Sequence, residues 1–563
     1  DGQIAGFVAK RFLAGDGIHY EPRWFKPWPA GHRTQIELRS QRYPLGDLCF
    51  DCGGVLVGFE ICEDAWVANR PGAALALRGV DVIVNPSASH FAFGKYDVRH
   101  RFVLEGSRAF SVSYVYSNLL GNESGRAIYD GGALIAAAGK VYAEGPRFSF
   151  ADFQVTSAQI DLHDTRMKQA STGSFRPDLE PGEACVRVPF EFPLQEPEPR
   201  GVTLAAWERS PHIKEEEFAR AVSLALFDYL RKSRSQGFVV SLSGGADSST
   251  ITCLIALMAA WGVAELGSER FREKLGYIAR LREATTVAEI VRALLVCVYQ
   301  STENSSELTR RAARTVAEAV GAEFLEFDVG RLVAEYIDMV SRAIGRKLEW
   351  SRDDLALQNI QARVRSPGVW MLANLRGALL LSTSNRSEAA VGYATMDGDT
   401  SGGLSPIAGI DKAFLRHWLR WLETVGPADL RPLPELAIVN NQAPTAELRP
   451  PGDKQTDEQD LMPYEVLDAA ERAAIRDKLM PLEVFLRLRP QFPQYAPAEL
   501  GMWVERFFRL WCRNQWKRER YAPSFHLDDE NLDPKTWCRF PILSGGFERE
   551  LNQLREYLAK LER

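Results

Sequence analysis

Three features of other protein classes are missing from this sequence of 563 residues. Its eight cysteines have neither the spacing of a disulfide framework nor that of a metal site, which favours a reducing compartment. No apolar run comes near the roughly 20 residues that cross a bilayer. The net charge of -6 argues against the basic face that nucleic-acid binding needs. We therefore expect a cytoplasmic protein with neither a nucleic-acid nor a membrane partner.

The chain is too long for one core, because single cores seldom exceed roughly 250–300 residues. Residues 1–168 alternate short apolar runs with helical stretches, which indicates layered α/β architecture. A segment rich in Pro, Glu and Arg follows and is expected to be a linker over residues 169–212. Residues 213–563 begin a second α/β alternation, whose apolar runs are typical of parallel strands covered on both faces. Because the sequence begins directly in a strand-like stretch, we expect that it starts inside a longer polypeptide.

A turn rich in glycine and serine follows the buried run at Phe238–Leu242, and it lacks the lysine of the usual nucleotide loop. Its members are Ser243, Gly244, Gly245, Ala246, Asp247, Ser248 and Ser249. Backbone N–H groups at such a strand-to-helix turn bind anions, and glycines allow close approach. A carboxylate facing phosphate is repulsive unless a divalent cation lies between them. The turn therefore predicts a nucleotide site in which a divalent cation lies between Asp247 and the phosphates.

The same seven residues resemble the pyrophosphate loop of the N-type ATP pyrophosphatases, which cleave ATP between its α and β phosphates. Two later blocks, Asn359–Arg365 and Ser382–Lys412, resemble the NAD synthetase family. That resemblance implies that Thr383, Glu388 and Lys412 contact ATP or its metal, with Glu388 and Asp247 as the Mg²⁺ ligands. It implies deamido-NAD contacts for Arg363, Lys517 and Arg518. Ser384 stands where the family has Gly, and Met396 stands where some ammonia-dependent members have Lys.

The N-terminal part resembles the glutaminase domain of glutamine-dependent NAD synthetases, which belongs to the nitrilase superfamily. The segment Gly58–Trp66 matches the nucleophile segment, and Val8–Phe25 matches the lysine segment. The resemblance implies catalytic roles for Cys62, Lys10 and Glu21, and glutamine contacts for Ser89, Lys95 and Tyr20. The superfamily's catalytic glutamate lies upstream of its lysine, and only nine residues, none of them Glu, precede Lys10. We expect that a segment carrying that glutamate is omitted from this sequence.

Together these resemblances predict a nitrilase-like α-β-β-α sandwich, incomplete at its N-terminus, and a doubly wound parallel-sheet ATP pyrophosphatase domain. They imply that glutamine supplies ammonia, ATP adenylates deamido-NAD, and ammonia displaces AMP to give NAD. The implied partners are these small molecules and a homo-oligomer with dimeric synthetase domains. Two alternatives remain: another amidotransferase of the pyrophosphatase group, such as a GMP synthetase, or a nucleotide-binding scaffold whose amidase half is dead.

Overall fold

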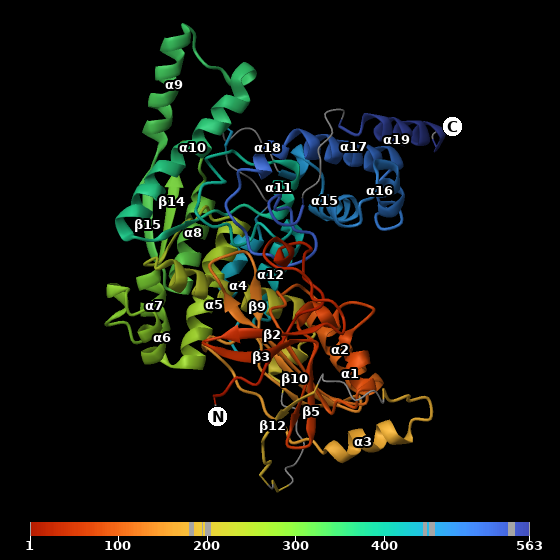
Figure 1. Cartoon of the computed structure of the whole chain (residues 1–563). Coiled ribbons are helices and arrows are strands. Elements are labelled where there is room, and N and C mark those ends of the chain that lie inside the picture. Colours follow the sequence, from red (N-terminus) through yellow and green to blue (C-terminus); the bar gives the residue numbers. More distant parts are fainter. Residues whose placement is uncertain are drawn as a thin grey trace. The chain divides into compact units, whose positions relative to one another are not determined.

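The chain folds as two units, each with its own sheet and core (Figure 1). In this computed structural model, unit 1 comprises Asp1–Gly121 and Tyr129–Arg209, and unit 2 comprises Asn122–Ile128 and Ser210–Arg563. The structure describes residues 2–178, 185–193, 195–196, 204–442, 448–449, 457–538 and 546–561. Parts of the predicted linker, and most of the polar segment that follows residue 442, lie outside the described residues.

Unit 1 is built on a seven-stranded sheet in the order β11-β10-β7-β6-β5-β4-β12. Its centre is parallel, because β5, β6 and β7 run in the same direction, whereas β10 and β11 are antiparallel. The predicted strand-like runs form these central strands. The members of the sheet are β4 (Cys49–Cys52), β5 (Val55–Phe59), β6 (Val82–Ser87), β7 (Ser113–Asn118), β10 (Ala133–Ala137), β11 (Lys140–Glu144) and β12 (Cys185–Val188).

Shorter elements complete unit 1. Strand β12 belongs to the segment predicted as a linker, and it pairs in parallel with β4. A separate sheet has the order β1-β3-β2, and β8 pairs with β9. The bounds of these elements are β1 (Phe7–Val8), β2 (Arg33–Leu38), β3 (Gln41–Gly46), β8 (Leu120–Asn122), β9 (Ile128–Asp130), η1 (Glu21–Arg23), η2 (Cys62–Ala65), η3 (Ala206–Arg209), α1 (Pro71–Leu77), α2 (Lys95–Ala109) and α3 (Leu162–Ser171).

Unit 2 contains a fully parallel sheet in the order β15-β14-β13-β16. Its strands are β13 (Phe238–Ser241), β14 (Leu295–Ser301), β15 (Glu323–Asp328) and β16 (Leu379–Leu381). Side chains of β13, β14 and β16 pack against Val369 and Ala373 of α10 (Trp350–Arg376). The apolar runs are therefore buried strands, as the sequence predicts.

Most of the helices that accompany this sheet come between its strands, whereas α4 precedes the first strand and α11 follows the last. Helix α5 is the one described helix long and apolar enough to cross a membrane, and 67% of its apolar window is buried in the fold. It is therefore a core helix, although its 18-residue window is more apolar than the sequence reading allowed. These helices are α4 (Ile213–Ser233), α5 (Ala246–Leu266), α6 (Ser268–Lys274), η4 (Ala279–Leu281), α7 (Val287–Leu294), α8 (Glu307–Val320), α9 (Gly330–Ile344) and α11 (Arg386–Val391).

The last third of the chain is helical and has a core of its own, formed by large apolar side chains of α15, α16, α17 and α19 (Figure 1). The elements of this part are α12 (Lys412–Thr424), η5 (Pro434–Leu436), α13 (Ala437–Asn440), α14 (Asp457–Asp460), α15 (Tyr464–Glu471), a π-helical turn η6 (Arg472–Arg476), α16 (Pro481–Leu488), α17 (Pro497–Arg513), α18 (Gln515–Arg518) and α19 (Glu548–Leu561).

Candidate active sites

A cavity of about 920 Å³ opens at the carboxyl ends of the parallel strands in unit 2. Ser241, Gln300 and Leu381 bring the ends of three strands to its wall. Ligands of open α/β sheets bind at this edge, because the loops there are free of the strand ladder. Of the residues predicted to bind ATP or deamido-NAD, the lining includes Ser243, Gly245, Ala246, Asp247, Thr383, Glu388, Lys412, Arg363 and Lys517.

The predicted phosphate loop begins α5 at this cavity. Gly244 has a left-handed φ of 83°, and a Cβ there would lie 2.3 Å from the carbonyl oxygen of Thr309. Only glycine fits that position. Gly245 is the N-cap of α5, and its N–H donates to Oγ of Ser243 at 3.3 Å. The first turn of α5 therefore presents backbone N–H groups and a positive helix end to the cavity.

The side chains of Ser248 and Ser249 do not line the cavity, although they belong to the loop. Ser248 is buried, and its hydroxyl contacts Oγ of Ser243 at 3.1 Å. Ser249 is fully buried, and its Oγ has no hydrogen-bond partner among the described residues. Because successive residues of a helix point about 100° apart, Asp247 faces the cavity whereas the next two residues, Ser248 and Ser249, do not.

Two carboxylates and one ammonium meet at the cavity wall. Nζ of Lys412 donates to Asp247 and lies 3.2 Å from Oε1 of Glu388. Asn385 joins them, because its side chain donates to Oδ1 of Asp247 at 3.2 Å and accepts from the backbone N of Glu388 at 2.9 Å. Sequence reasoning missed Asn385, although its position before a helix is a recognisable N-cap signal.

The residues predicted to bind deamido-NAD separate into two environments. Nε of Arg363 donates to the carbonyl of Met396 at 3.0 Å, and Nζ of Lys517 donates to the carbonyl oxygens of Gly392 and Ala394. Both side chains line the cavity. Arg518 does not: it is buried, its guanidinium lies 3.6 Å from the Trp511 ring centroid, and it donates to main-chain carbonyls.

Asp399, which the sequence did not single out, also lines the cavity, as does Ser384. The Asp399 carboxylate accepts from the backbone N of Thr395 at 2.8 Å. Its carbonyl accepts from the hydroxyls of Ser382 and Ser384. Ser384, which replaces the family's glycine, is thus used to hold the loop that carries Met396 and Asp399. No sequence pattern indicates this role.

Unit 1 brings together the segments of the predicted glutaminase residues. Nζ of Lys10 lies 2.6 and 2.7 Å from the carboxylate oxygens of Glu21, which also accepts from the backbone N of Ala14. Cys62 follows β5 with a left-handed φ of 51°, a strained conformation for a non-glycine residue. Asp64 accepts from the backbone N of Phe12 at 2.8 Å and of Ile61 at 2.9 Å. Asp64 therefore joins the lysine segment to the cysteine segment.

The predicted glutamine-contacting residues differ in exposure. Ser89 is buried, and its Oγ has no hydrogen-bond partner among the described residues. Nζ of Lys95 lies 3.1 Å from the His90 ring nitrogens, and the His90 ring lies 2.9 Å from His19. Burial, assisted by Lys95, lowers the pKa of His19 to about 4. Tyr20 is 61% exposed. The two histidines were missed, because a lone histidine carries no spacing signal.

Two family models match this chain. The NAD synthase model matches residues 218–491, and the carbon-nitrogen hydrolase model matches residues 4–169. The chain is 33% identical to the glutamine-dependent NAD(+) synthetase of Oryza sativa subsp. indica over 92% of this chain and 74% of that protein. This chain belongs to the glutamine-dependent NAD(+) synthetase family.

Further relatives agree with this family. The glutamine-dependent NAD(+) synthetase of Saccharomyces cerevisiae is 30% identical over 98% of this chain and 83% of the yeast protein. A crystal structure of a glutamine-dependent NAD(+) synthetase from Cytophaga hutchinsonii aligns with a TM-score of 0.78 and 43% identity, covering 98% of this chain and 82% of that one. The predicted α/β fold, nitrilase-like in unit 1 and NAD synthase-like in unit 2, is confirmed.

Proposed function

We propose specific residue roles for glutamine-dependent NAD synthesis, the reaction of this family. The chain is an ATP-dependent carbon–nitrogen ligase that takes its amide nitrogen from glutamine and forms NAD from deamido-NAD. The family match removes the GMP synthetase alternative. The observation that carries the proposal is the meeting of Lys412, Asp247 and Glu388, which are distant in sequence, at the mouth of the phosphate loop.

The adenylation step is assigned to the cavity of unit 2. The nicotinate carboxylate attacks the α phosphate of ATP, the bond to the β phosphate breaks, and pyrophosphate leaves. Backbone N–H groups of the loop from Ser243 to Ser249 hold the leaving group, and the Lys412 ammonium neutralises charge that develops on it. Thr383 contacts ATP, and Arg363 and Lys517 bind the anionic dinucleotide. Arg518 is left out of this set, because its donors are used inside the fold.

The carboxylates of Asp247 and Glu388 suit a magnesium ion. Among the described residues no group of three or more His, Cys, Asp and Glu is placed to hold a metal. Mg²⁺ is commonly bound by one or two carboxylates together with substrate phosphates, so two acids beside a phosphate loop are a fitting donor set. When bound there, Mg²⁺ would neutralise phosphate charge. The Lys412 ammonium contacts both of these carboxylates. We propose that it turns toward the phosphates when the substrate is in place.

Ammonia release is assigned to unit 1. The Cys62 thiolate attacks the side-chain amide of glutamine, forming a thioester and releasing ammonia, and water then hydrolyses the thioester to glutamate. Lys10, held by Glu21, stabilises the oxyanion that forms at the attacked carbonyl. Ser89 and Lys95, with Tyr20, are proposed to hold the substrate. We propose functional boundaries at residues 1–168 for this domain, 169–212 for the linker and 213–563 for the synthetase.

An exposed apolar stripe on α9 supports the proposal that the synthetase units pair with each other in a homo-oligomer. It consists of Leu332, Tyr336, Met339, Val340 and Ile344, each at least 41% exposed. Their spacing places them on one face of the helix. Exposed apolar surface of this kind is typical of an interface. We also propose a cytoplasmic location, since all eight cysteines are free thiols.

The nitrogen source provides the test of these roles. The enzyme is supplied with ATP, Mg²⁺ and deamido-NAD, together with either glutamine or ammonium, and NAD is measured. For Cys62→Ala we expect loss of the glutamine-driven reaction and an unchanged ammonium-driven reaction, because only the first needs the thiolate. Cys52→Ala, in the same unit, is the matched control and should retain both reactions. Glutamine-driven synthesis by Cys62→Ala would contradict the assignment, and NAD formation from neither source by the unaltered protein would favour the scaffold alternative.

A further inference from the structure

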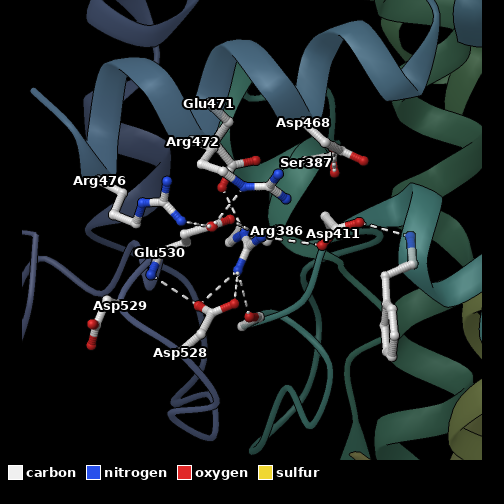
Figure 2. A network of polar contacts seen from close by, with 12 residues as sticks. Arg386, Ser387, Asp411, Asp468, Glu471, Arg472, Arg476, Asp528, Asp529 and Glu530 are labelled. Atoms are coloured by element: carbon white, nitrogen blue, oxygen red, sulfur yellow. Dashed lines mark hydrogen bonds and ion pairs between the residues drawn. The ribbon is translucent and has the colours of Figure 1, made fainter. Parts of the chain in front are cut away.

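Arg386 is an arginine with 1% exposure, located in unit 2 two residues before Glu388 (Figure 2). It is the first residue of α11. Figure 2 shows its guanidinium at the centre of a group of carboxylates, with Glu471 on one side and Asp528 on the other. Because Arg386 does not line the cavity, the reaction described above gives it no role.

Four carboxylates contact this one guanidinium. Nε lies 2.7 Å from Glu471, and one terminal nitrogen lies 2.9 Å from both oxygens of Asp528. The other terminal nitrogen donates to Asp411 at 3.2 Å and to Glu530 at 2.8 Å. These acids come from the end of α15, the N-cap of α12 and the segment 528–530. A planar guanidinium is the side chain that satisfies several fixed acceptors in different directions.

The backbone and the guanidinium of Arg386 both contact the main chain of the segment that leads into α12. The backbone N of Arg386 donates to the carbonyl of Ile410 at 2.8 Å, and a guanidinium nitrogen donates to the carbonyl of Gly409 at 3.0 Å. Arg386 therefore binds both the start of α11 and the segment that leads into α12. Those two helix starts carry Glu388 and Lys412.

A second link runs through the neighbouring serine. Oγ of Ser387 accepts from the backbone N of Lys412 at 2.9 Å and donates to Asp468 at 2.5 Å. Asp468 also accepts from the backbone N of Ala413 at 3.1 Å. The first turn of α12 is thus held on one side by Ser387 and Asp468, and on the other by its N-cap Asp411, which Arg386 contacts.

We infer that Arg386 is a positioning residue for adenylation, which sets the Lys412 ammonium and the Glu388 carboxylate at their places around Asp247. It does so by joining the start of α11 to the start of α12. The inference rests on the role proposed for Lys412. Buried ion pairs are a weak source of net stability, since desolvation offsets much of the attraction. A displacement of about 1 Å at a reacting group, however, costs roughly a hundredfold in rate.

Arg386→Gln tests this inference in the full-length enzyme, with ammonium as the nitrogen source so that unit 1 is not involved. Glutamine keeps two donors but not the fork or the charge. We expect kcat to fall roughly 30- to 100-fold and the KM for ATP to change less than about threefold, because the phosphate loop is untouched. The matched control is Arg220→Gln, which removes another buried arginine of unit 2, paired with Glu216 and Asp429, and should keep its kcat.

A double-mutant cycle separates positioning from general destabilisation. If Arg386 acts through Lys412, adding Arg386→Gln to Lys412→Ala should slow the reaction further by less than about threefold. The same large slowing in both backgrounds would overturn the inference. Normal kcat in Lys412→Ala alone would instead refute the role proposed for Lys412.

If Arg386→Gln does not unfold in a cooperative thermal transition, Asp528→Asn provides a second test of the inference. Asp528 is 18% exposed and contacts only one edge of the guanidinium, so its loss is milder. We expect a fall in kcat of roughly three- to tenfold, again absent in the Lys412→Ala background. If neither Asp528→Asn nor Arg386→Lys, each as a single substitution, changes kcat, the inference is overturned.

Discussion

The two lysines with proposed catalytic roles, Lys10 and Lys412, obtain their carboxylate partners in different ways. Lys10 pairs with Glu21, only 11 residues along the chain, through a loop that enters η1. Lys412 pairs with Asp247, 165 residues away, and with Glu388, 24 residues away. The first pair depends on local chain geometry, whereas the second exists only when α5, α11 and α12 are packed together. A distant pairing needs more support from surrounding structure than a local one.

The surroundings of the two lysines fit this difference. The side chains of Lys10 and Glu21 are 15% and 34% exposed, and the Asp64 carboxylate holds the Lys10 segment to the Cys62 segment. The Lys412 side chain is 5% exposed, and its helix start is held through Ser387, Asp411 and Asp468. We therefore expect substitutions in unit 2 to be less local in their effects than those in unit 1.

Among the substitutions that test this comparison, Asp247→Asn is expected to have the largest effect on the rate of NAD formation. The amide keeps the shape of the side chain but removes the charge that a cation and Lys412 require. We expect both the glutamine-driven and the ammonium-driven rates to fall roughly 100- to 1,000-fold, as for loss of a preorganised electrostatic contact. Initial rates of NAD formation with each nitrogen source measure this.

Glu505→Gln makes the same acid-to-amide change on α17, where the carboxylate pairs with Arg509 and Arg555 away from the cavity. It should leave both rates within about twofold, as expected of a surface ion pair. A fall confined to one nitrogen source in Asp247→Asn would show that the residue does not act in adenylation.

A smaller effect is expected from Glu21→Gln, which leaves Lys10 without its counter-charge. The glutamine-driven rate should fall roughly 10- to 100-fold, because the ammonium is no longer fixed near the carbonyl under attack. The ammonium-driven rate should not change. Glu105→Gln, an exposed acid of the same unit that pairs with Arg108, serves as the control. Equal loss of both reactions in Glu21→Gln would mean that this pair supports the fold and not the chemistry.

The smallest effect concerns the pH dependence of stability in unit 2. Burial, opposed by Arg386, raises the pKa of Glu471 to about 8, whereas an unfolded glutamate titrates near 4.5. The folded state therefore retains a proton that the unfolded state releases. The contribution of Glu471 to the free energy of unfolding is complete below about pH 4.5 and is lost as the pH rises toward 8. Between pH 6 and pH 8.5 we expect a loss on the order of 2 kcal/mol, because part of the effect of this pKa shift is already complete at pH 6.

Thermal unfolding at pH 6 and pH 8.5 measures this loss. In Glu471→Gln the difference in Tm between the two pH values should be smaller than in the unaltered protein. Glu483→Gln, at the N-terminus of α16, is the control and should keep the original difference. An unchanged pH difference in Glu471→Gln would show that Glu471 is ionised throughout.

Helix geometry explains which parts of the site the sequence did not predict. Lys517 and Arg518 are adjacent and both positively charged, yet Lys517 lines the cavity and Arg518 stacks on Trp511 inside the fold. Asp247 and Ser249 show the same separation on α5. A motif places residues along the chain, but about 100° of rotation per residue decides which side chain faces the ligand.

The sequence by itself determined the central strands β5, β6 and β7 of unit 1, the strands of the parallel sheet in unit 2, the glycine turn at Gly244, the order of the two domains and the family. These follow from apolar runs, from the left-handed backbone that glycine permits, and from motifs only a few residues long. Only the tertiary structure decided that Asn385 holds Asp247, that the Met396 carbonyl holds Arg363, and that Arg386 joins two helix starts. These contacts link residues far apart in the chain, and long-range packing carries no local pattern from which they can be read.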